Sequence, residues 1–305
     1  MPTSVCVWLT RQGSAESQKL TASNHVHTAL CSSTALLVPY SSWHVPRYHE
    51  WMKDPVSHSR SPGGGTGVPK PASQDESLTR LQEIQEATAS EPLSIEEEYS
   101  MQRSWRQDAD KLTFIVCRAI TTGDEDDIPS QRKLQAESDS PSNMVGDINL
   151  FLRIDDGDDG DSPPQIVGEV ELMIAEKVNQ RRGFGRAALL MFMRYIVERQ
   201  GSILDEFVGS GDVDVETVRK LRTGVEASGS SEGLELECLS VKIGHTNSKS
   251  LALFESTGFE KCSEEPNFFG EFELRRKDLS LGSVDGALEK AGVKGFIALP
   301  YERTE

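Results

Sequence analysis

The stretch that most constrains this chain is residues 179–200, NQRRGFGRAALLMFMRYIVERQ, in which two glycines lie among arginines and an apolar helical pattern follows. Two alternating runs precede it, at 144–154 (MVGDINLFLRI) and 166–176 (IVGEVELMIAE). Alternating runs joined by a polar loop are typical of an antiparallel hairpin. The sequence therefore predicts a hairpin strand, a glycine turn and a long helix, in that order.

Three phosphate-binding motifs place a glycine turn before a helix. A P-loop needs G-x-x-x-x-G-K-[ST], and the stretch has no Lys followed by Ser or Thr. A dinucleotide fingerprint fits Gly183, Gly185 and Ala188, with Asp205 about twenty residues on, but it belongs after the first strand of a series of βα units. The third motif, Q/R-x-x-G-x-G/A after a hairpin strand, fits the spacing of Gln180, Gly183 and Gly185.

The third motif has a simple physical basis. Small residues let the backbone approach a pyrophosphate, to which the free amides of the first helical turn donate. Each charge at a helix N-terminus gains roughly 0.3 to 1 kcal/mol. Arg181, Arg182 and Arg186 add positive charge for a polyanion. A plain turn with exposed arginines is the alternative interpretation, but the order of strand, turn and long helix favours a ligand site.

This arrangement resembles the acyl-CoA-binding core of the GCN5-related N-acetyltransferase superfamily, over about residues 35–278. LLVPYSSWHVPRYHEWM, MVGDINLFL, GEVELMIAE and FFGEFELR are similar, more narrowly, to its alpha-tubulin N-acetyltransferase-like branch. The resemblance implies an α/β (α+β) fold with a mixed, mostly antiparallel central sheet flanked by helices. It also implies that strands splay apart at the acetyl-CoA site.

The resemblance further implies acetyl-CoA as co-substrate and no metal. Backbone groups of Met173, Ile174 and Ala175 would pair with the pantetheine amides. Asn247 would contact the cofactor arm, although a simple helix N-cap explains this residue equally well. The residues implied to surround the pyrophosphate are Gln180, Arg181, Arg182, Gly183, Phe184, Gly185 and Arg186.

The implied reaction is direct attack of an amine on the acetyl thioester, with a backbone N–H near Ile174 polarising the carbonyl and a base taking the amine proton. Glu171 is the first candidate base and Glu169 the second, and His245 is a further one. Phe254 occupies the position at which many relatives have a tyrosine that protonates the leaving thiolate. That role is therefore vacant here or filled by water.

We therefore expect acetyl transfer from acetyl-CoA to a protein amine, above all an N-terminal α-amine, with tubulin as the substrate that the branch name implies. Two alternatives stay open. One is an acetyltransferase for a small-molecule amine. The other is a protein that binds acetyl-CoA without turnover, which Phe254 favours.

Composition limits the partners. A net charge of −17 argues against a nucleic-acid partner, because phosphate contacts need a basic face. No apolar run approaches bilayer length, so no membrane association is expected. The five cysteines never pair as C-x-x-C, which fits a reducing compartment and no metal site. We expect a soluble cytoplasmic protein.

One N-acetyltransferase domain is expected at 34–278, between a disordered extension at 1–33 and a C-terminal tail at 279–305 with a weak helix at VDGALEKAG. Segments rich in Gly, Ser, Pro and acidic residues cannot bury enough apolar surface to offset the entropy of ordering. They predict flexible insertions at about 54–82, 121–143, 155–165 and 204–234.

Strands are also predicted at 34–40, 111–120 and 236–244, from their β-branched and aromatic content. Ser94 and Glu97 have the spacing of a capping box at the start of a helix.

Overall fold

A computed structural model of the protein describes residues 24–53, 93–120, 134–156, 163–228 and 233–303. The described strands form one nine-stranded sheet in the order β7-β8-β6-β5-β4-β3-β2-β1-β9. The strands are β1 (Thr28–Cys31), β2 (Ala35–Pro39), β3 (Lys111–Arg118), β4 (Met144–Asp155), β5 (Gln165–Ile174), β6 (Leu236–Gly244), β7 (Glu260–Lys261), β8 (Glu271–Arg276) and β9 (Ile297–Pro300). Within this sheet β5 and β6 are parallel, and the other neighbours are antiparallel.

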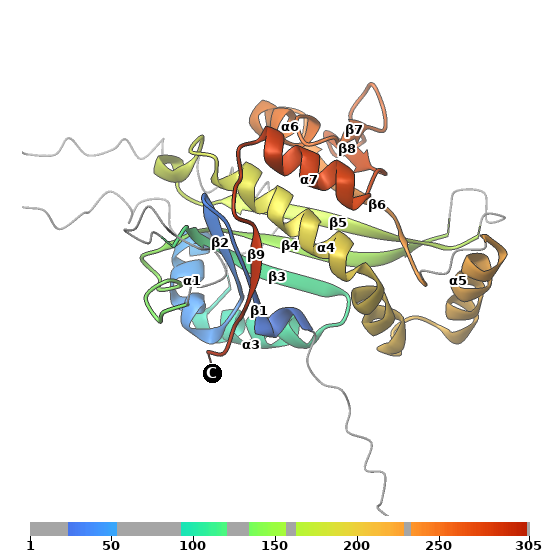
Figure 1. Ribbon diagram of the computed structural model, residues 1–305, viewed down its shortest axis with the longest axis horizontal. Coiled ribbons are helices and arrows are strands. Elements are labelled where there is room, and N and C mark those ends of the chain that lie inside the picture. Colours follow the sequence, from blue (N-terminus) through green and yellow to red (C-terminus); the bar gives the residue numbers. More distant parts are fainter. Residues whose placement is uncertain (1–23, 54–92, 121–133, 157–162, 229–232, 304–305) are drawn as a thin grey trace, which may run out of the picture.

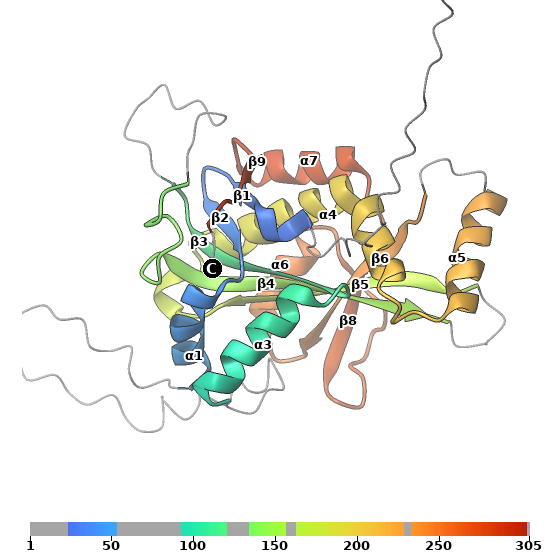
Figure 2. The ribbon, with the colours of Figure 1, turned by 90° about the horizontal axis from the view of Figure 1, so that it is seen from below.

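Helices cover both faces of the sheet (Figure 1). The described helices are α1 (Val45–Lys53), α3 (Ile95–Gln107), α4 (Phe184–Gly209), α5 (Val215–Ser228), α6 (Ser248–Glu255) and α7 (Leu281–Lys290). Figure 2 shows α4 and α7 on one side of the sheet and α1 and α3 on the other. This confirms the expected mixed, mostly antiparallel sheet flanked by helices.

Two apolar clusters follow from the alternation of side chains along the central strands. Phe114 and Ile148 point toward α4 and pack with Phe192 in the larger cluster. Ile115, one residue further along β3, points the other way and packs with Trp51 of α1 in the second cluster. The two faces of one sheet are thus buried by different helices.

Most predicted elements are confirmed. β4 and β5 form the antiparallel hairpin, with Ile148 opposite Leu172. The capping box at the start of α3 is present, since the Glu97 amide donates to Ser94 Oγ and the Ser94 amide donates to Glu97 Oε2. The strands predicted at 34–40, 111–120 and 236–244 correspond to β2, β3 and β6.

The prediction of disorder for 1–33 is wrong for residues 24–33, and the segment at 279–305 is more than a tail. β1 lies between β2 and β9, so that Ala29 pairs with Leu299. Four-residue strands from the two ends of the chain meet here. A local sequence pattern cannot reveal such a pairing.

The insertion predicted at 204–234 is also wrong in part. Helix α4 continues to Gly209 because Leu204, Phe207 and Val208 extend its buried stripe beyond Gly201. Helix α5 follows over Val215–Ser228, within the segment predicted to be flexible. β4 and β5 also reach residues 155 and 165. The insertion predicted at 54–82, and residues 157–162, lie outside the described residues.

Part of the insertion predicted at 121–143 is ordered by a buried carboxylate. Asp139 is 1% exposed and accepts hydrogen bonds from Tyr301 Oη (2.6 Å), Trp43 Nε1 (3.2 Å) and the Arg303 guanidinium. Burial alone would raise the pKa of this carboxyl, but the neighbouring His44 and Tyr301 side chains and the charge of Arg303 hold the pKa below its usual value. Asp139 therefore ties the C-terminal strand to the region before α1.

Candidate active site

Strands β5 and β6 separate in the middle of the sheet. They pair only from Ile166 to Glu169 on β5. Beyond that point β6 continues against β8, and β5 continues against β4 as far as Ile174. Residues 170–174 of β5 therefore have no strand partner on the β6 side within the described chain. This opening is the splay that the resemblance implies.

Backbone groups at the end of β5 alternate in direction. The Ala175 amide donates to the Val145 carbonyl at 3.0 Å, so Ala175 and, by alternation, Met173 face β4. Consistent with this, a Cβ on Gly146 would come within 1.9 Å of the Met173 carbonyl oxygen. Ile174 faces the opening. Among the three residues expected to pair with pantetheine, only Ile174 has its amide directed there.

Gln180 supports this strand end. Its side-chain amide donates to the Ile174 carbonyl at 3.2 Å. The carbonyl that faces the opening is thereby satisfied, while the Ile174 N–H on the same side has no acceptor among the described residues. The structure thus gives Gln180 a positioning contact with the backbone.

The glycine turn has a left-handed backbone. Gly183 has φ 91° and is the N-cap of α4, and Arg181 has φ 59°. Among the described residues, Arg181 is the one non-glycine residue with positive φ, a conformation that costs of order 1 kcal/mol or more and is concentrated at functional sites. The first helical bond runs from the Ala187 amide to the Gly183 carbonyl at 2.9 Å. The amides of residues 184–186 precede it, with no acceptor in the described part of the chain.

The first turn of α4 lies against the opening. A Cβ on Gly185 would lie 3.6 Å from Ile174 Cγ1 and 3.5 Å from Leu253 Cδ2 of α6. The first turn of α4, with its unpaired amides, is therefore close to the Ile174 side chain at the end of β5. Phe184 itself is buried in the core.

Three arginines surround this helix end. Arg181 and Arg182 are exposed, and the Arg182 guanidinium lies 5.8 Å from the ring centroid of Phe184. Arg186 is also exposed and donates to Ser256 Oγ at 3.1 Å. In a protein of net charge −17 this is a local concentration of positive charge at a helix N-terminus.

The other predicted residues downstream have structural contacts. Asn247 caps α6 by accepting a hydrogen bond from the Ser250 amide at 3.1 Å. Phe254 is 3% exposed and packs edge-on against Phe259, with ring centroids 5.1 Å apart. Exposed His245 contacts the Gly270 carbonyl through Nδ1 at 2.8 Å. Phe254 therefore belongs to the core, where a tyrosine hydroxyl would need a partner.

The sheet face opposite α4 carries polar side chains in rows across the strands. In one row Thr113, Asn149 and Glu171 lie side by side on β3, β4 and β5. In the next row Asp147 lies opposite Met173. Since side chains alternate along a strand, all of these share the face that α1 and α3 cover.

Asp147 is a residue of this face that the sequence analysis missed. It is 3% exposed, and its Oδ2 accepts from Asn149 Nδ2 at 2.8 Å. Burial raises the pKa of this carboxyl to about 7, the charge of Glu171 adds to the rise, and the Asn149 bond opposes it. The available signal was an acidic residue within an otherwise apolar strand, in MVGDINLFL.

The two predicted glutamates differ in their surroundings. Glu169 forms an ion pair with Lys242, with Nζ and Oε2 2.8 Å apart. Glu171 reaches solvent, yet partial enclosure and the charge of Glu169 raise its pKa against the opposing charge of Lys242. Of the two glutamates, Glu171 is therefore the one whose carboxylate has no close ion pair within the described chain.

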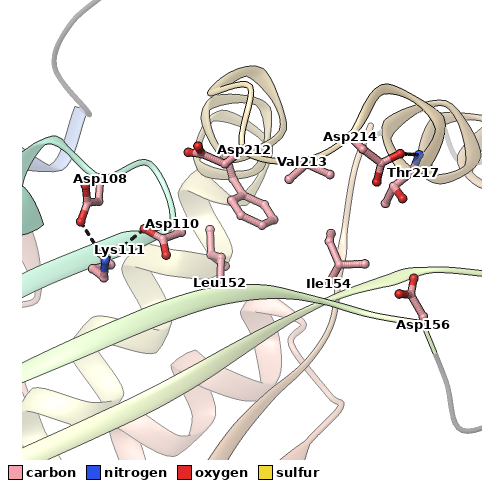
Figure 3. A pocket seen from close by; sticks show the side chains of 11 residues that line it. Asp108, Asp110, Lys111, Leu152, Ile154, Asp156, Asp212, Val213, Asp214 and Thr217 are labelled. Carbon is pink, nitrogen blue, oxygen red and sulfur yellow. Dashed lines mark hydrogen bonds and ion pairs between the residues drawn. The ribbon is translucent and has the colours of Figure 1, made fainter.

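A cavity of about 490 Å³ lies elsewhere, beside Leu152 and Ile154 near the far end of β4 and under the start of α5 (Figure 3). Lys111 contacts Asp108 and Asp110 at its rim. The opening is flanked by β4 residues 146–150 instead, so this cavity is separate from it.

No protein-family model matches this chain. An N-acetyltransferase 9-like protein of Schizosaccharomyces pombe is 31% identical over 268 residues, which cover 82% of this chain and 97% of the relative. The chain belongs to the N-acetyltransferase 9 family. It is an acyltransferase.

Two other members of the N-acetyltransferase 9 family are similar. The Nematostella vectensis N-acetyltransferase 9-like protein is 32% identical, over 79% of this chain and 81% of its own length. The Drosophila melanogaster alpha/beta-tubulin-N-acetyltransferase 9 is 37% identical, over 62% of this chain and 72% of its own length.

Solved structures with some likeness include Mycobacterium smegmatis RimJ in complex with CoA-disulfide, 13% identical with a TM-score of 0.43 over 88% of this chain and 95% of that chain. In the described residues no helix is long and apolar enough to cross a membrane, and no group of three or more His, Cys, Asp or Glu could hold a metal ion.

The buried Asp147 carboxyl makes stability depend on pH. Between about pH 4, where an unfolded Asp titrates, and about pH 7, the folded state keeps a proton that the unfolded state has lost, so the wild type loses stability as pH rises. Asp147→Asn removes this loss and can still accept the Asn149 bond. Its advantage in free energy of unfolding should grow across this window to a few kcal/mol, at about 1.4 kcal/mol per pKa unit, and then level off.

Urea unfolding of both proteins at several values between about pH 4 and pH 8 checks this expectation. A difference that stays constant across the window would contradict a buried carboxyl with a raised pKa.

Proposed function

We propose that this protein transfers the acetyl group of acetyl-CoA to a protein amine, with an N-terminal α-amine as acceptor. The observation that carries the proposal is that two adjacent elements each present backbone amides that have no acceptor in the described chain. Ile174 offers one at the opening between β5 and β6, and residues 184–186 offer others at the start of α4. One long ligand with a thioester carbonyl and a diphosphate would satisfy both.

The residues of the turn would hold the diphosphate end. Amides at a helix N-terminus donate to phosphate oxygens, and the helix dipole adds to the attraction. Gly183 leaves the approach to these amides free because it has no side chain. The space beside it is open, since an added Cβ would have only Thr34 Cγ2 within 4 Å among the described atoms. Arg181, Arg182 and Arg186 would supply charge around the anion.

The acetyl end would lie at Ile174. Its N–H, directed into the opening, would donate to the thioester carbonyl oxygen and stabilise the negative charge that develops there during attack. The Gln180 contact with the Ile174 carbonyl would keep this peptide group in place.

The acceptor amine would approach from the opposite face, under α1 and α3, where Glu169 and Glu171 lie. Carboxylates favour a cationic amine. Because Glu169 is held by Lys242, Glu171 is the candidate base of the two. Alpha- or beta-tubulin is the proposed substrate, after the name of the Drosophila relative. The cytoplasm is the proposed location that goes with this substrate.

Release of free thiol from acetyl-CoA tests the function. Peptides with the N-terminal sequences of alpha- and beta-tubulin should release thiol in proportion to added peptide, and the same peptides with a blocked N-terminus should not. Spermidine and buffer alone serve as comparisons. Turnover with spermidine but with no peptide would overturn the protein-amine assignment, and no turnover with any amine would overturn the enzyme function.

The diphosphate site is tested by Gly183→Glu, which places a carboxylate where the phosphates should lie. Acetyl-CoA binding should weaken about tenfold or more, which corresponds to 1.4 kcal/mol or more. Gly211→Glu is a matched control, because Gly211 has φ 93° against 91° at Gly183 and lies in open space after α4. It carries the same strain and charge and should bind as wild type. Equal affinities of the two variants in calorimetric titrations would contradict the proposed site.

A further inference from the structure

We propose that Asp147 and Glu171 form a carboxylate pair that binds the acceptor ammonium, and that Asp147 receives the proton that the amine must lose before it attacks the thioester. This role rests on the proposed acetyl transfer. It moves the base from Glu171 to Asp147 and leaves Glu171 to bind the ammonium.

The placement follows from strand register. Asp147 lies on β4 opposite Met173, beside the strand end at Ile174. Glu171 lies two residues before Met173 on β5 and on the same face. Such diagonal positions on neighbouring strands are within reach of long side chains, and the charge of Glu171 adds to the rise in the pKa of Asp147. The two carboxyls therefore share one face beside the peptide group that faces the opening.

Buried polar atoms without partners surround this position. Within the described chain, Asp147 Oδ1, Asn149 Oδ1, Thr113 Oγ1 and Tyr40 Oη have no hydrogen-bond partner, and all four residues are at most 4% exposed. Buried polar groups in folded proteins are nearly always paired. Asn149 Oδ1 can only accept, Asp147 Oδ1 can only accept once its carboxyl is ionised, and the two hydroxyls can accept as well. A ligand with several N–H donors, such as an ammonium group, would satisfy them.

The described residues also leave Asp147 without a compensating cation. The groups facing it are Glu171 from β5, Tyr40 after β2 and Tyr48 from α1, none of them positively charged. Further out, His49 of α1 lies 3.7 Å from Glu98 of α3.

Two other acidic residues, Asp139 and Glu169, differ in this respect. Asp139 has Arg303 and Glu169 has Lys242. A buried carboxyl that lacks a cation is destabilising by itself. We infer that the substrate ammonium supplies the missing charge.

The proton steps balance without any further group. The ammonium gives one proton to the Asp147 carboxylate, which becomes a neutral acid. The nitrogen lone pair then bonds to the acetyl carbon, the carbon–sulfur bond breaks, and the sulfur leaves with the electron pair. The second nitrogen proton passes to the thiolate, and Asp147 returns its proton to solvent when the products leave. This route needs no side-chain acid at the buried Phe254 position.

The test compares wild type, Asp147→Asn, Glu171→Gln and the double variant. Glu237→Gln on β6 is the control, because Glu237 contacts Gln165 at the other end of β5 from Ile174. Three quantities are measured: acetyl-CoA affinity, affinity for a free-amine and an N-acetylated tubulin peptide, and kcat/KM against pH. Asp147→Asn should bind acetyl-CoA as wild type does. Its kcat/KM should fall about 100-fold or more, as expected for loss of a general base, and the acid limb of the wild-type pH profile should disappear.

The same variant should bind the free-amine peptide about tenfold more weakly and the N-acetylated peptide without change. If the two carboxyls act as a unit, the double variant should be little slower than Asp147→Asn alone. Melting temperatures report whether each variant is folded, and if Asp147→Asn fails to fold, Glu171→Gln carries the same expectations for amine binding and rate.

The outcomes separate this inference from the function itself. If wild type acetylates peptides but Asp147→Asn keeps its rate and pH profile, the inference is wrong and the acetyl transfer stands. If wild type acetylates nothing, peptide affinity decides: a preference for the free amine that depends on Asp147 supports the pair, and no such preference overturns it.

Discussion

The separation of β5 from β6 after Glu169 is the constraint on which the rest of the site depends. A strand inside a sheet has its N–H and C=O groups paired on both sides, and unpaired groups away from water are unfavourable. Here β5 keeps β4 on one side and loses its other neighbour, so Ile174 turns its amide to an open edge. The left-handed turn at Gly183 then directs α4 back over this edge, which brings its first amides to the same place.

The alternation of side chains along β5 places apolar and acidic residues on opposite faces of the sheet. Leu172 and Ile174 pack toward α4, whereas Glu169 and Glu171 point toward the face of α1 and α3. A cofactor bound at the start of α4 and an amine bound under α1 would therefore approach the end of β5 from opposite sides. The same period of two residues that makes a strand thus separates an apolar, phosphate-binding side from an acidic, amine-binding one.

The elements that sequence reasoning finds are those with local patterns. The hairpin, the turn at Gly183 and the caps at Ser94 and Asn247 each depend on residues a few positions apart. What it missed depends on distant partners: β1 needs β9 from the other end of the chain. Asp147 likewise becomes chemically distinct only when α1 and α3 cover its strand, because an acidic residue in a strand is ordinarily a solvated one.

Hydrogen–deuterium exchange with and without saturating CoA tests the central claim most directly, since it reports on the backbone amides themselves. The account predicts slower exchange in peptides that contain Ile174 and residues 183–186, and little change in peptides from α5, which lies away from the opening. Protection confined to other segments, or none at a CoA concentration that binding measurements show to be saturating, would contradict it.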